Sequence, residues 1–214
     1  MERIIKKIKL TSTLTVLTGL HIGGSKDSVE IGGIDNPVIK MATRKDQPYI
    51  PGSSLKGKMR CLLEQVNGAV KTGRSAKVNS LFGYSSDNQP SRLIVRDAYL
   101  TESSLTMLNA CQSLDMPYTE NKYENTIDRI KGVAEHPRQT ERVPAGTEFA
   151  IEMIINIWED DKEEDLLDLL AQGVSLIEND YLGGSGSRGY GQVKFAPFKR
   201  VDLSPSNNWN AYGH

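Results

Sequence analysis

The alternation of apolar and polar side chains over residues 149–157 constrains the fold of this chain more than any other feature. Apolar residues occupy every second position there: Phe149, Ile151, Met153, Ile155 and Ile157. Successive side chains of a strand point to opposite faces, so the pattern predicts a strand with one buried face. A second alternating segment, with Ile8, Leu10, Leu14 and Val16, predicts another half-buried strand.

Two segments have the apolar spacing of amphipathic helices. The first starts at residues 51–54, where a serine is expected to cap it, and ends near Gly68. Its apolar stripe consists of Leu55, Met59, Leu62, Leu63 and Val66. Cys61 is expected on the apolar side of this helix, as a small core residue. The second helix begins at the acidic residues 159–165, and its apolar face consists of Leu166, Leu167, Leu170, Val174 and Ile177.

The remaining segments complete the predicted element order. Short strands are expected at 92–99 and around Val193 and Phe195, and residues 69–91 are interpreted as a polar loop. Residues 101–146 have no simple periodicity and are interpreted as a charged insertion, with a projecting hairpin. Without the insertions the order is β-α-β-β-α-β, which predicts an α+β, ferredoxin-like (RRM-type) fold. Many functions occur on that fold, so it does not by itself indicate one.

Composition limits the classes of protein to consider. The chain has 214 residues and a net charge of −1, so any surface for nucleic acid must be local. Its two cysteines, Cys61 and Cys111, have neither a disulfide framework nor a metal-binding spacing. Neither a secretory leader nor an apolar run long enough to cross a bilayer is found, so a cytoplasmic protein without membrane contact is expected.

The segment 180–193 is the densest in glycine. It contains five glycines around Arg188, between the predicted second helix and the last strand. Backbone N–H groups in such a turn can form a concavity for an anion, and arginine can clamp a phosphate. A flexible surface loop is the alternative. A nucleotide-binding enzyme is a further alternative, but the segment lacks the Lys-Ser/Thr ending of a Walker loop and precedes a strand.

Other candidate residues lie near the first helix. Lys56, Lys58 and Arg60 oppose the dipole of a helix start, which favours phosphate binding, although solvated side chains would give the same pattern. His21 and Asp35 lie in a long glycine- and proline-rich loop. An aspartate before Asn-Pro is also a common turn former, so Asp35 could be structural or catalytic.

Five motifs occur in a specific order along the chain. They are Gly19-Leu-His-Ile-Gly-Gly24, Ile34-Asp-Asn-Pro-Val-Ile39, Ile50-Pro-Gly-Ser-Ser-Leu-Lys-Gly-Lys-Met-Arg60, Glu124-Asn-Thr-Ile-Asp-Arg129 and Gly183-Gly-Ser-Gly-Ser-Arg-Gly-Tyr-Gly191. In this combination the chain resembles the backbone subunits of type III-A (Csm) CRISPR effector complexes, in the RAMP superfamily. The resemblance extends from the first strand to about Phe198.

The resemblance implies a domain organisation and a guide RNA interface. It implies a single RAMP domain over 1–201, with a palm at 1–100 and 146–201 and an inserted thumb at about 101–145; residues 202–214 are expected to be a flexible tail. Contacts to the guide backbone are implied for Ser53, Ser54, Lys56, Lys58, Arg60, Gly184, Ser185 and Arg188. His21 would lie close to the RNA, and Arg129 of the thumb would help to flip every sixth guide nucleotide.

The resemblance also implies an activity and partners. Asp35 would cleave the target RNA opposite each flipped nucleotide with a divalent metal, Mg²⁺ or Mn²⁺, which makes it both the catalytic and the metal-binding residue. The implied partners are CRISPR guide RNA, single-stranded target RNA, further copies of the chain and other Csm subunits, including the large polymerase-like one. A non-catalytic RNA-binding scaffold remains the alternative.

Overall fold

The two strands with the clearest alternation lie side by side in the sheet. The computed structural model describes residues 3–24, 36–71 and 73–203. β1 (Ile4–Val16) and β7 (Glu148–Trp158) pair antiparallel, with Ile8 opposite Ile155 and Leu14 opposite Phe149. The even-numbered residues of β1 and the odd-numbered residues of β7 thus supply the buried face, as the sequence predicts.

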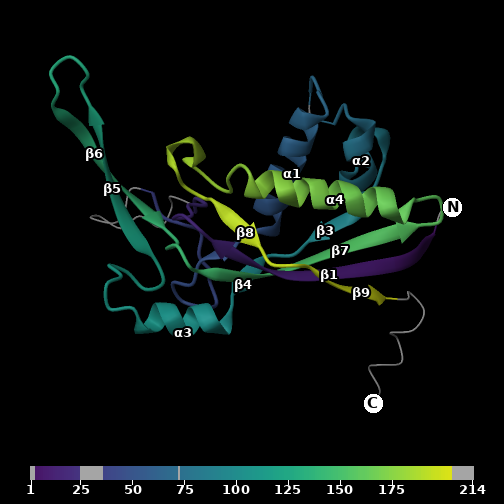
Figure 1. Ribbon diagram of the computed structural model, residues 1–214, viewed down its shortest axis with the longest axis horizontal. Coiled ribbons are helices and arrows are strands. Elements are labelled where there is room, and N and C mark those ends of the chain that lie inside the picture. The colour runs from purple at the N-terminus through teal and green to yellow at the C-terminus, as the bar shows by residue number, and fades with distance from the viewer. Residues whose placement is uncertain (1–2, 25–35, 72, 204–214) are drawn as a thin grey trace.

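The other strands extend this pair into a seven-stranded sheet (Figure 1). They are β2 (Tyr49–Ile50), β3 (Leu93–Val95), β4 (Ala98–Leu100), β8 (Val193–Phe195) and β9 (Lys199–Leu203). β3 and β4 pair with β7, β8 and β9 pair with β1, and β2 pairs with β4, all antiparallel. The order β8-β1-β7-β3 is that of a ferredoxin-like sheet, and the predicted α+β fold is confirmed.

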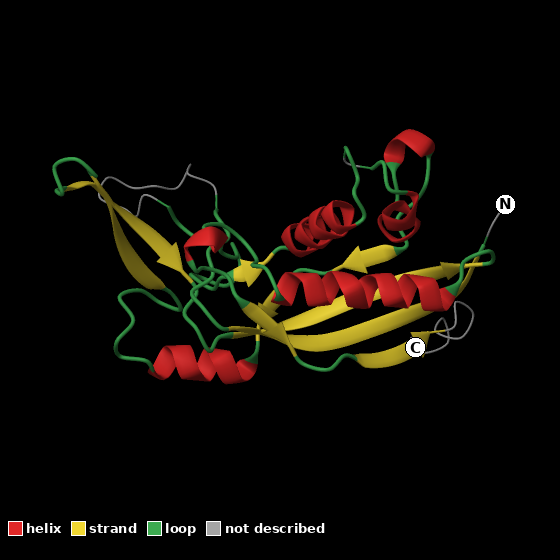
Figure 2. Ribbon diagram, turned by 45° about the horizontal axis from the view of Figure 1, so that its top comes forward, coloured by secondary structure: helices red, strands yellow, loops and turns green. Residues whose placement is uncertain are grey.

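Helices α1 (Gly52–Val66) and α4 (Glu163–Glu178) cover one face of the sheet (Figure 2). They approach closely because Gly173 has no side chain: a Cβ there would lie 2.4 Å from Cγ of Met59. The core between helices and sheet includes Leu55, Met59 and Leu63 of α1. No helix in residues 3–24, 36–71 and 73–203 combines the length and the hydrophobicity needed to cross a membrane.

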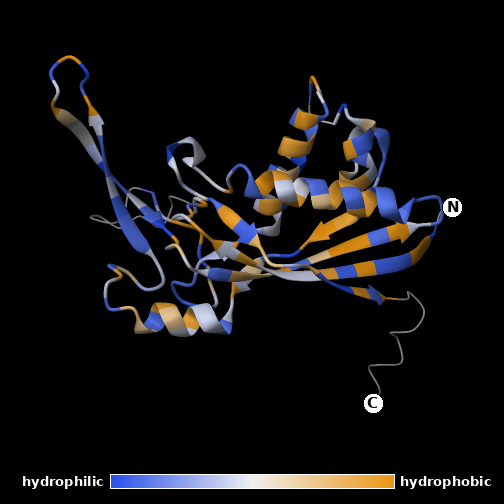
Figure 3. Ribbon diagram, viewed as in Figure 1, coloured by the Kyte–Doolittle hydropathy of each residue, from blue (hydrophilic) through white to orange (hydrophobic). Residues whose placement is uncertain are grey.

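The expected hairpin is formed by β5 (Glu120–Ile127) and β6 (Ala134–Arg142) and projects away from the sheet (Figure 1). Helix α3 (Glu102–Ala110), which the sequence analysis did not predict, precedes it. The stem of the hairpin is mostly hydrophilic and its tip carries hydrophobic residues (Figure 3). Ile127, Ile130 and Val133 are exposed there.

Several local predictions were wrong. Cys61 is exposed, not buried, because it lies one position before Leu62, about 100° away from the covered side of α1. Val66 is also exposed, at the last turn of the helix. No serine caps α1: the cap residue is Pro51 and makes no side-chain hydrogen bond.

Residues 69–91 are not simply a polar loop. They contain α2 (Ala76–Phe82), capped by the Ser75 hydroxyl, and a 3₁₀ turn, η2 (Ser85–Asp87). Leu81 and Phe82 are buried in the core, so this segment extends the helical layer.

Candidate functional site

The glycine-rich segment is a fixed loop that contains a 3₁₀ turn, η3 (Gly186–Arg188). Gly183 has φ +79°, and a Cβ there would lie 2.3 Å from the carbonyl oxygen of His21. Gly191 has φ +71°, and its Cβ would lie 2.0 Å from the Leu182 carbonyl oxygen. Both positions therefore exclude any other residue type. The flexible-loop alternative does not describe this segment, which packs closely against its surroundings.

Three successive N–H groups of this loop lie at the start of the 3₁₀ turn. Those of Ser185, Gly186 and Ser187 donate to no acceptor in the described parts of the chain. Ser185 has φ +58°, a left-handed conformation that turns the backbone at this point. The geometry fits the predicted anion-binding concavity.

His21 joins this loop to the base of the hairpin. Its carbonyl oxygen accepts a hydrogen bond from the N–H of Gly184, at 2.8 Å. Its Nδ1 lies 2.7 Å from the carbonyl oxygen of Glu141 in β6. Since a carbonyl oxygen can only accept, Nδ1 is the donor in this contact. The structure thus brings His21, Gly184 and Ser185 together.

Arg188 and Tyr190 complete the contact between loop and hairpin. The Tyr190 hydroxyl donates to Oε1 of Glu124 in β5, at 2.7 Å, and Nη1 of Arg188 lies 3.6 Å from Oε2 of the same carboxylate. Burial and the adjacent Glu124 raise the pKa of Tyr190 to about 12. The Tyr190 hydrogen bond, with nearby Lys122 and Arg138, lowers the pKa of Glu124. The carboxylate therefore stays ionised at neutral pH.

The cations of α1 do not form one surface. Nζ of Lys56 donates to the Ser91 hydroxyl at 2.8 Å and to the Leu93 carbonyl oxygen at 2.7 Å, and burial lowers its pKa. Arg60 donates to Glu64 and Asn79. Both side chains therefore contact α2 or residues 91–93 at the start of β3.

Lys58, by contrast, lies beside the glycine loop. Its Nζ is 2.7 Å from Oδ2 of Asp180 and 3.6 Å from the centre of the Tyr181 ring. Gly186 packs directly on that ring, since a Cβ there would lie 1.9 Å from Cγ of Tyr181. Lys58 and the loop therefore share one aromatic support.

The start of α1 already has an anionic partner. Oδ1 of Asp97 accepts a hydrogen bond from the N–H of Gly52, at 2.8 Å. Ser53 is exposed and Ser54 is half-buried next to it. Sequence reasoning missed Asp97, because only the pairing of β2 with β4 brings it to the helix start.

Arg129 lies far from the other candidates. It is exposed at the hairpin tip, where the Asp128 carboxylate accepts the N–H groups of Ile130 and Lys131. The projection of the hairpin separates this tip from the glycine loop (Figure 1). Only a long ligand, or a second chain, could contact Arg129 and the glycine loop at the same time.

Asp35 lies outside the described residues, but the chain immediately after it is held firmly. The carbonyl oxygen of Asn36 accepts the N–H of Glu141, and Oε2 of Glu141 accepts the N–H of Val38 at 2.9 Å. Oε1 of this buried carboxylate contacts Lys40 and Thr119. The long loop thus ends at the hairpin base, next to His21.

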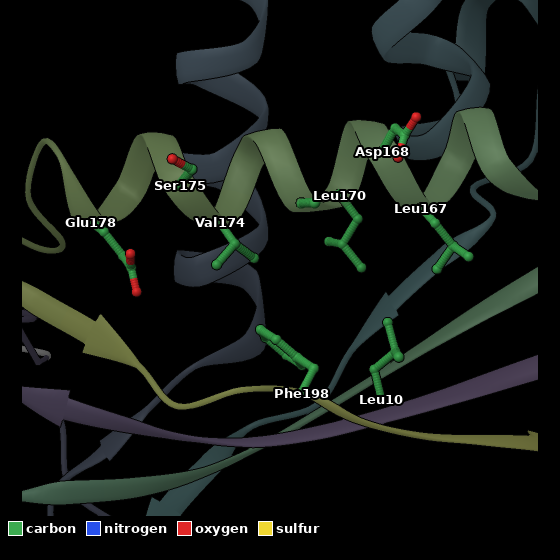
Figure 4. Close-up of a pocket in the computed structure, with 9 residues that line it drawn as sticks. Leu10, Leu167, Asp168, Leu170, Val174, Ser175, Glu178 and Phe198 are labelled. Carbon is green, nitrogen blue, oxygen red and sulfur yellow. The ribbon is translucent and has the colours of Figure 1, made fainter.

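Two further observations limit the site. The described residues contain no group of three or more His, Cys, Asp or Glu side chains placed to hold a metal. A cavity of about 390 Å³ lies between α4 and the sheet, lined by Leu10, Leu167, Leu170, Val174 and Phe198 (Figure 4). Its walls are apolar and its rim carries Asp168 and Glu178, so it does not suit a phosphate.

Comparison with known proteins identifies the family. The model of the RAMP superfamily matches residues 13–194. The chain belongs to the RAMP superfamily. Curated relatives named CRISPR system Cms endoribonuclease Csm3 place it in the Csm3 family. The relative from Streptococcus thermophilus is 46% identical, and the match covers 92% of this chain and 90% of the relative. The relative from Methanocaldococcus jannaschii is 43% identical, and the match covers 91% of this chain and 81% of the relative.

Solved structures agree with this assignment. A crystal structure of the Csm3-Csm4 subcomplex of the type III-A CRISPR-Cas interference complex matches with a TM-score of 0.62 and 30% identity, over 99% of this chain and 86% of that one. A Type III-B Cmr-beta structure bound to cognate target RNA matches with a TM-score of 0.66. Its identity of 17%, over 92% of this chain and 61% of that one, supports the fold alone.

Proposed function

We propose that this protein is an endoribonuclease and a backbone subunit of a type III-A CRISPR effector complex. In this function several copies stack along a CRISPR guide RNA, and each cleaves the complementary target RNA, at intervals of six nucleotides. The observation that carries the proposal is the similarity, over about nine tenths of the chain, to relatives named as Csm3 endoribonucleases. Other Csm subunits, including the large polymerase-like one, complete the complex.

The guide backbone is expected to lie along the glycine loop. The N–H groups of Ser185 and Gly186, which have no acceptor within residues 3–24, 36–71 and 73–203, can donate to a phosphate. Arg188 and Lys58 can add charge. His21 lies at the same place, which supports its proposed nearness to the RNA. Gly184 would contribute by the close approach of its backbone. Ser53 and Ser54 would add hydroxyl contacts at the start of α1.

Lys56 and Arg60 are less available to RNA than Lys58 and Arg188. Because their charged groups already donate to Ser91, Glu64 and Asn79, they would bind a phosphate only with hydrogen-bond donors that these contacts leave over. Arg129 would act apart from the loop, at the tip of the hairpin, next to the exposed Ile130. There it would help to displace a guide nucleotide.

Cleavage is assigned to Asp35. A carboxylate can orient the ribose 2′-OH for attack on the adjacent phosphate, or it can ligate a divalent metal. One carboxylate is a poor metal site alone, so Mg²⁺ or Mn²⁺ would need RNA phosphates and water as further ligands. When bound, the metal would supply charge stabilisation at the scissile phosphate.

The experiment compares wild-type and Asp35→Ala complexes on an end-labelled target RNA, with Mg²⁺, with Mn²⁺ and with EDTA. We expect both complexes to bind the target, and cleavage by the variant to fall by about 10²-fold or more. A ladder with regular six-nucleotide spacing should be absent with EDTA. Equal ladders from the two proteins would favour the alternative, a non-catalytic RNA-binding scaffold.

A further inference from the structure

Three cations surround one carboxylate where the hairpin meets the glycine loop. Oε1 of Glu124 lies 3.4 Å from Nζ of Lys122, and Oε2 lies 3.2 Å from Nη2 of Arg138 and 3.6 Å from Nη1 of Arg188. Lys122 and Arg138 belong to the two strands of the hairpin, and Arg188 belongs to the loop. Only the folded chain brings these groups together.

The carboxylate lies inside this cluster and the cations lie outside it. The side chain of Glu124 is 13% exposed, whereas those of Lys122, Arg138 and Arg188 are 36%, 44% and 55% exposed. On the side away from solvent, the hydroxyl of the buried Tyr190 donates a hydrogen bond to Glu124. An anion that approaches from solvent therefore meets the three cations first.

A phosphate can make the same contacts as this carboxylate. Both groups present acceptor oxygens that match an arginine side chain, and a phosphodiester carries the same single charge. The contact of Arg188 is the longest of the three, and Arg188 is the most exposed, so it can turn from Glu124 to a phosphate with little rearrangement. The N–H groups of residues 185–187, which have no acceptor among the residues that the structure describes, lie in the same loop.

We propose that Lys122, Arg138 and Arg188 form one phosphate-binding site for RNA, in which Glu124 pairs with these cations until a phosphate binds them from the solvent side. The inference rests on the proposed function and adds two hairpin residues to the RNA interface. Tyr190 keeps Glu124 in place when the phosphate arrives. The carboxylate therefore weakens RNA binding by competing for the cations and by repelling the phosphate.

The test uses the full chain and a labelled single-stranded RNA, with binding followed by fluorescence anisotropy at several salt concentrations. Glu124→Gln keeps an acceptor for Tyr190 but removes the charge, and we expect RNA binding to tighten roughly threefold to tenfold. Arg138→Gln and Arg188→Gln should weaken binding, each with a loss of about 0.7 in the slope of log K against log salt. In an Arg188→Gln background the gain from Glu124→Gln should shrink.

Glu152→Gln is the matched control, because it changes the net charge equally but lies in β7, paired with Lys9. We expect its RNA affinity to stay within about twofold of wild type. Weaker binding by a folded Glu124→Gln chain would overturn the inference and make Glu124 a structural residue only. No RNA binding by the wild type would instead refute the proposed function itself.

Thermal unfolding of each variant shows whether it is folded. Should Glu124→Gln not fold, Glu124→Asp withdraws the charge by one methylene group and keeps the net charge. We then expect Glu124→Asp to bind RNA at least as tightly as wild type. Weaker binding by a folded Glu124→Asp chain would contradict the proposed site.

Discussion

The hydroxyl of Tyr190 donates a hydrogen bond to Glu124, 2.7 Å away, and so connects the glycine loop to the projecting hairpin. The tyrosine side chain is 1% exposed, with Lys122 and Arg142 over its ring. This bond acts together with the contacts of Glu141 to His21, Val38 and Lys40 at the hairpin base, so it should contribute to both stability and hairpin orientation.

Removal of that hydroxyl should destabilise the fold without leaving a cavity. We expect Tyr190→Phe to lower the free energy of unfolding by about 1–2 kcal/mol, because a hydrogen bond to a charged group is lost in a buried place. Urea denaturation measures it. Tyr99→Phe, at an exposed ring on β4, is the control and should change little. Equal stability of the Tyr190 variant and wild type would contradict the expectation.

Two glycines of the loop separate backbone strain from steric contact. Gly183 and Gly189 both have positive φ, but a Cβ at Gly183 would lie 2.3 Å from a carbonyl oxygen, whereas no atom lies within 4 Å of one at Gly189. We expect Gly189→Ala to cost about 1 kcal/mol and Gly183→Ala clearly more. Thermal and urea unfolding of both chains check the order. Equal losses of stability in the two variants would mean that the backbone near His21 moves to accommodate the added Cβ at no cost.

Lys56 and Lys58 should respond differently to substitution, although they are two residues apart. Lys58→Ala should weaken RNA binding independently of RNA sequence and lower the salt slope by about 0.7, since Lys58 lies beside the glycine loop. Lys56→Ala should mainly lower stability, since it removes the hydrogen bonds to Ser91 and to Leu93, the first residue of β3. RNA titrations and urea unfolding of both variants make the comparison. A larger loss of RNA affinity from Lys56→Ala would reverse the assignment.

A network of four charges joins β1, β9 and the start of α4, and it predicts acid sensitivity. The hydrogen bond from Arg200, followed by that from Lys6, lowers the pKa of Asp202 to about 2, and the pKa of Glu163 is also lowered. A lowered pKa in the folded state gives stability that is present above the ordinary pKa of 3.8 and is lost as the pH falls toward about 2.

Asp202→Asn should therefore flatten the loss of stability between about pH 4 and pH 2. Urea midpoints measured across this range for wild type and variant provide the test. Asp168→Asn, at an exposed position on α4, carries the same charge change and should leave the acid limb of the profile as it is in wild type. A variant profile that parallels that of wild type would show that the network does not contribute.

Regular patterns predicted the layers of this fold, and contacts between distant segments decided the rest. The alternation around Met153 and the stripe around Met59 reflect burial on one face, which a sequence records directly. Helix α2 was missed because its seven residues form only about two turns, too few for the apolar spacing of a helix to be recognised. The short β9 was missed because Arg200 and Asp202 make its inner face polar.

The candidate site was predictable in its residue types but not in its partners. The glycine density at 183–191 and Arg188 indicated an anion site. Glycine tolerates positive φ and arginine carries its charge whatever their neighbours are, so both properties can be recognised from the sequence. Nothing in the sequence linked Lys56 to Ser91 or Gly52 to Asp97, because those contacts depend on the sheet order. Glu124 and Tyr190 are likewise 66 positions apart.

That separation has a consequence for the order of events during synthesis. The hairpin with Glu124 leaves the ribosome well before Tyr190 and Arg188, and β8, which follows the loop, completes one edge of the sheet beside β1. Until then the cations of the hairpin have no loop to face. A nascent chain that ends before the loop should therefore not capture RNA at this place, so that RNA binding there would begin only after almost the whole domain has been translated.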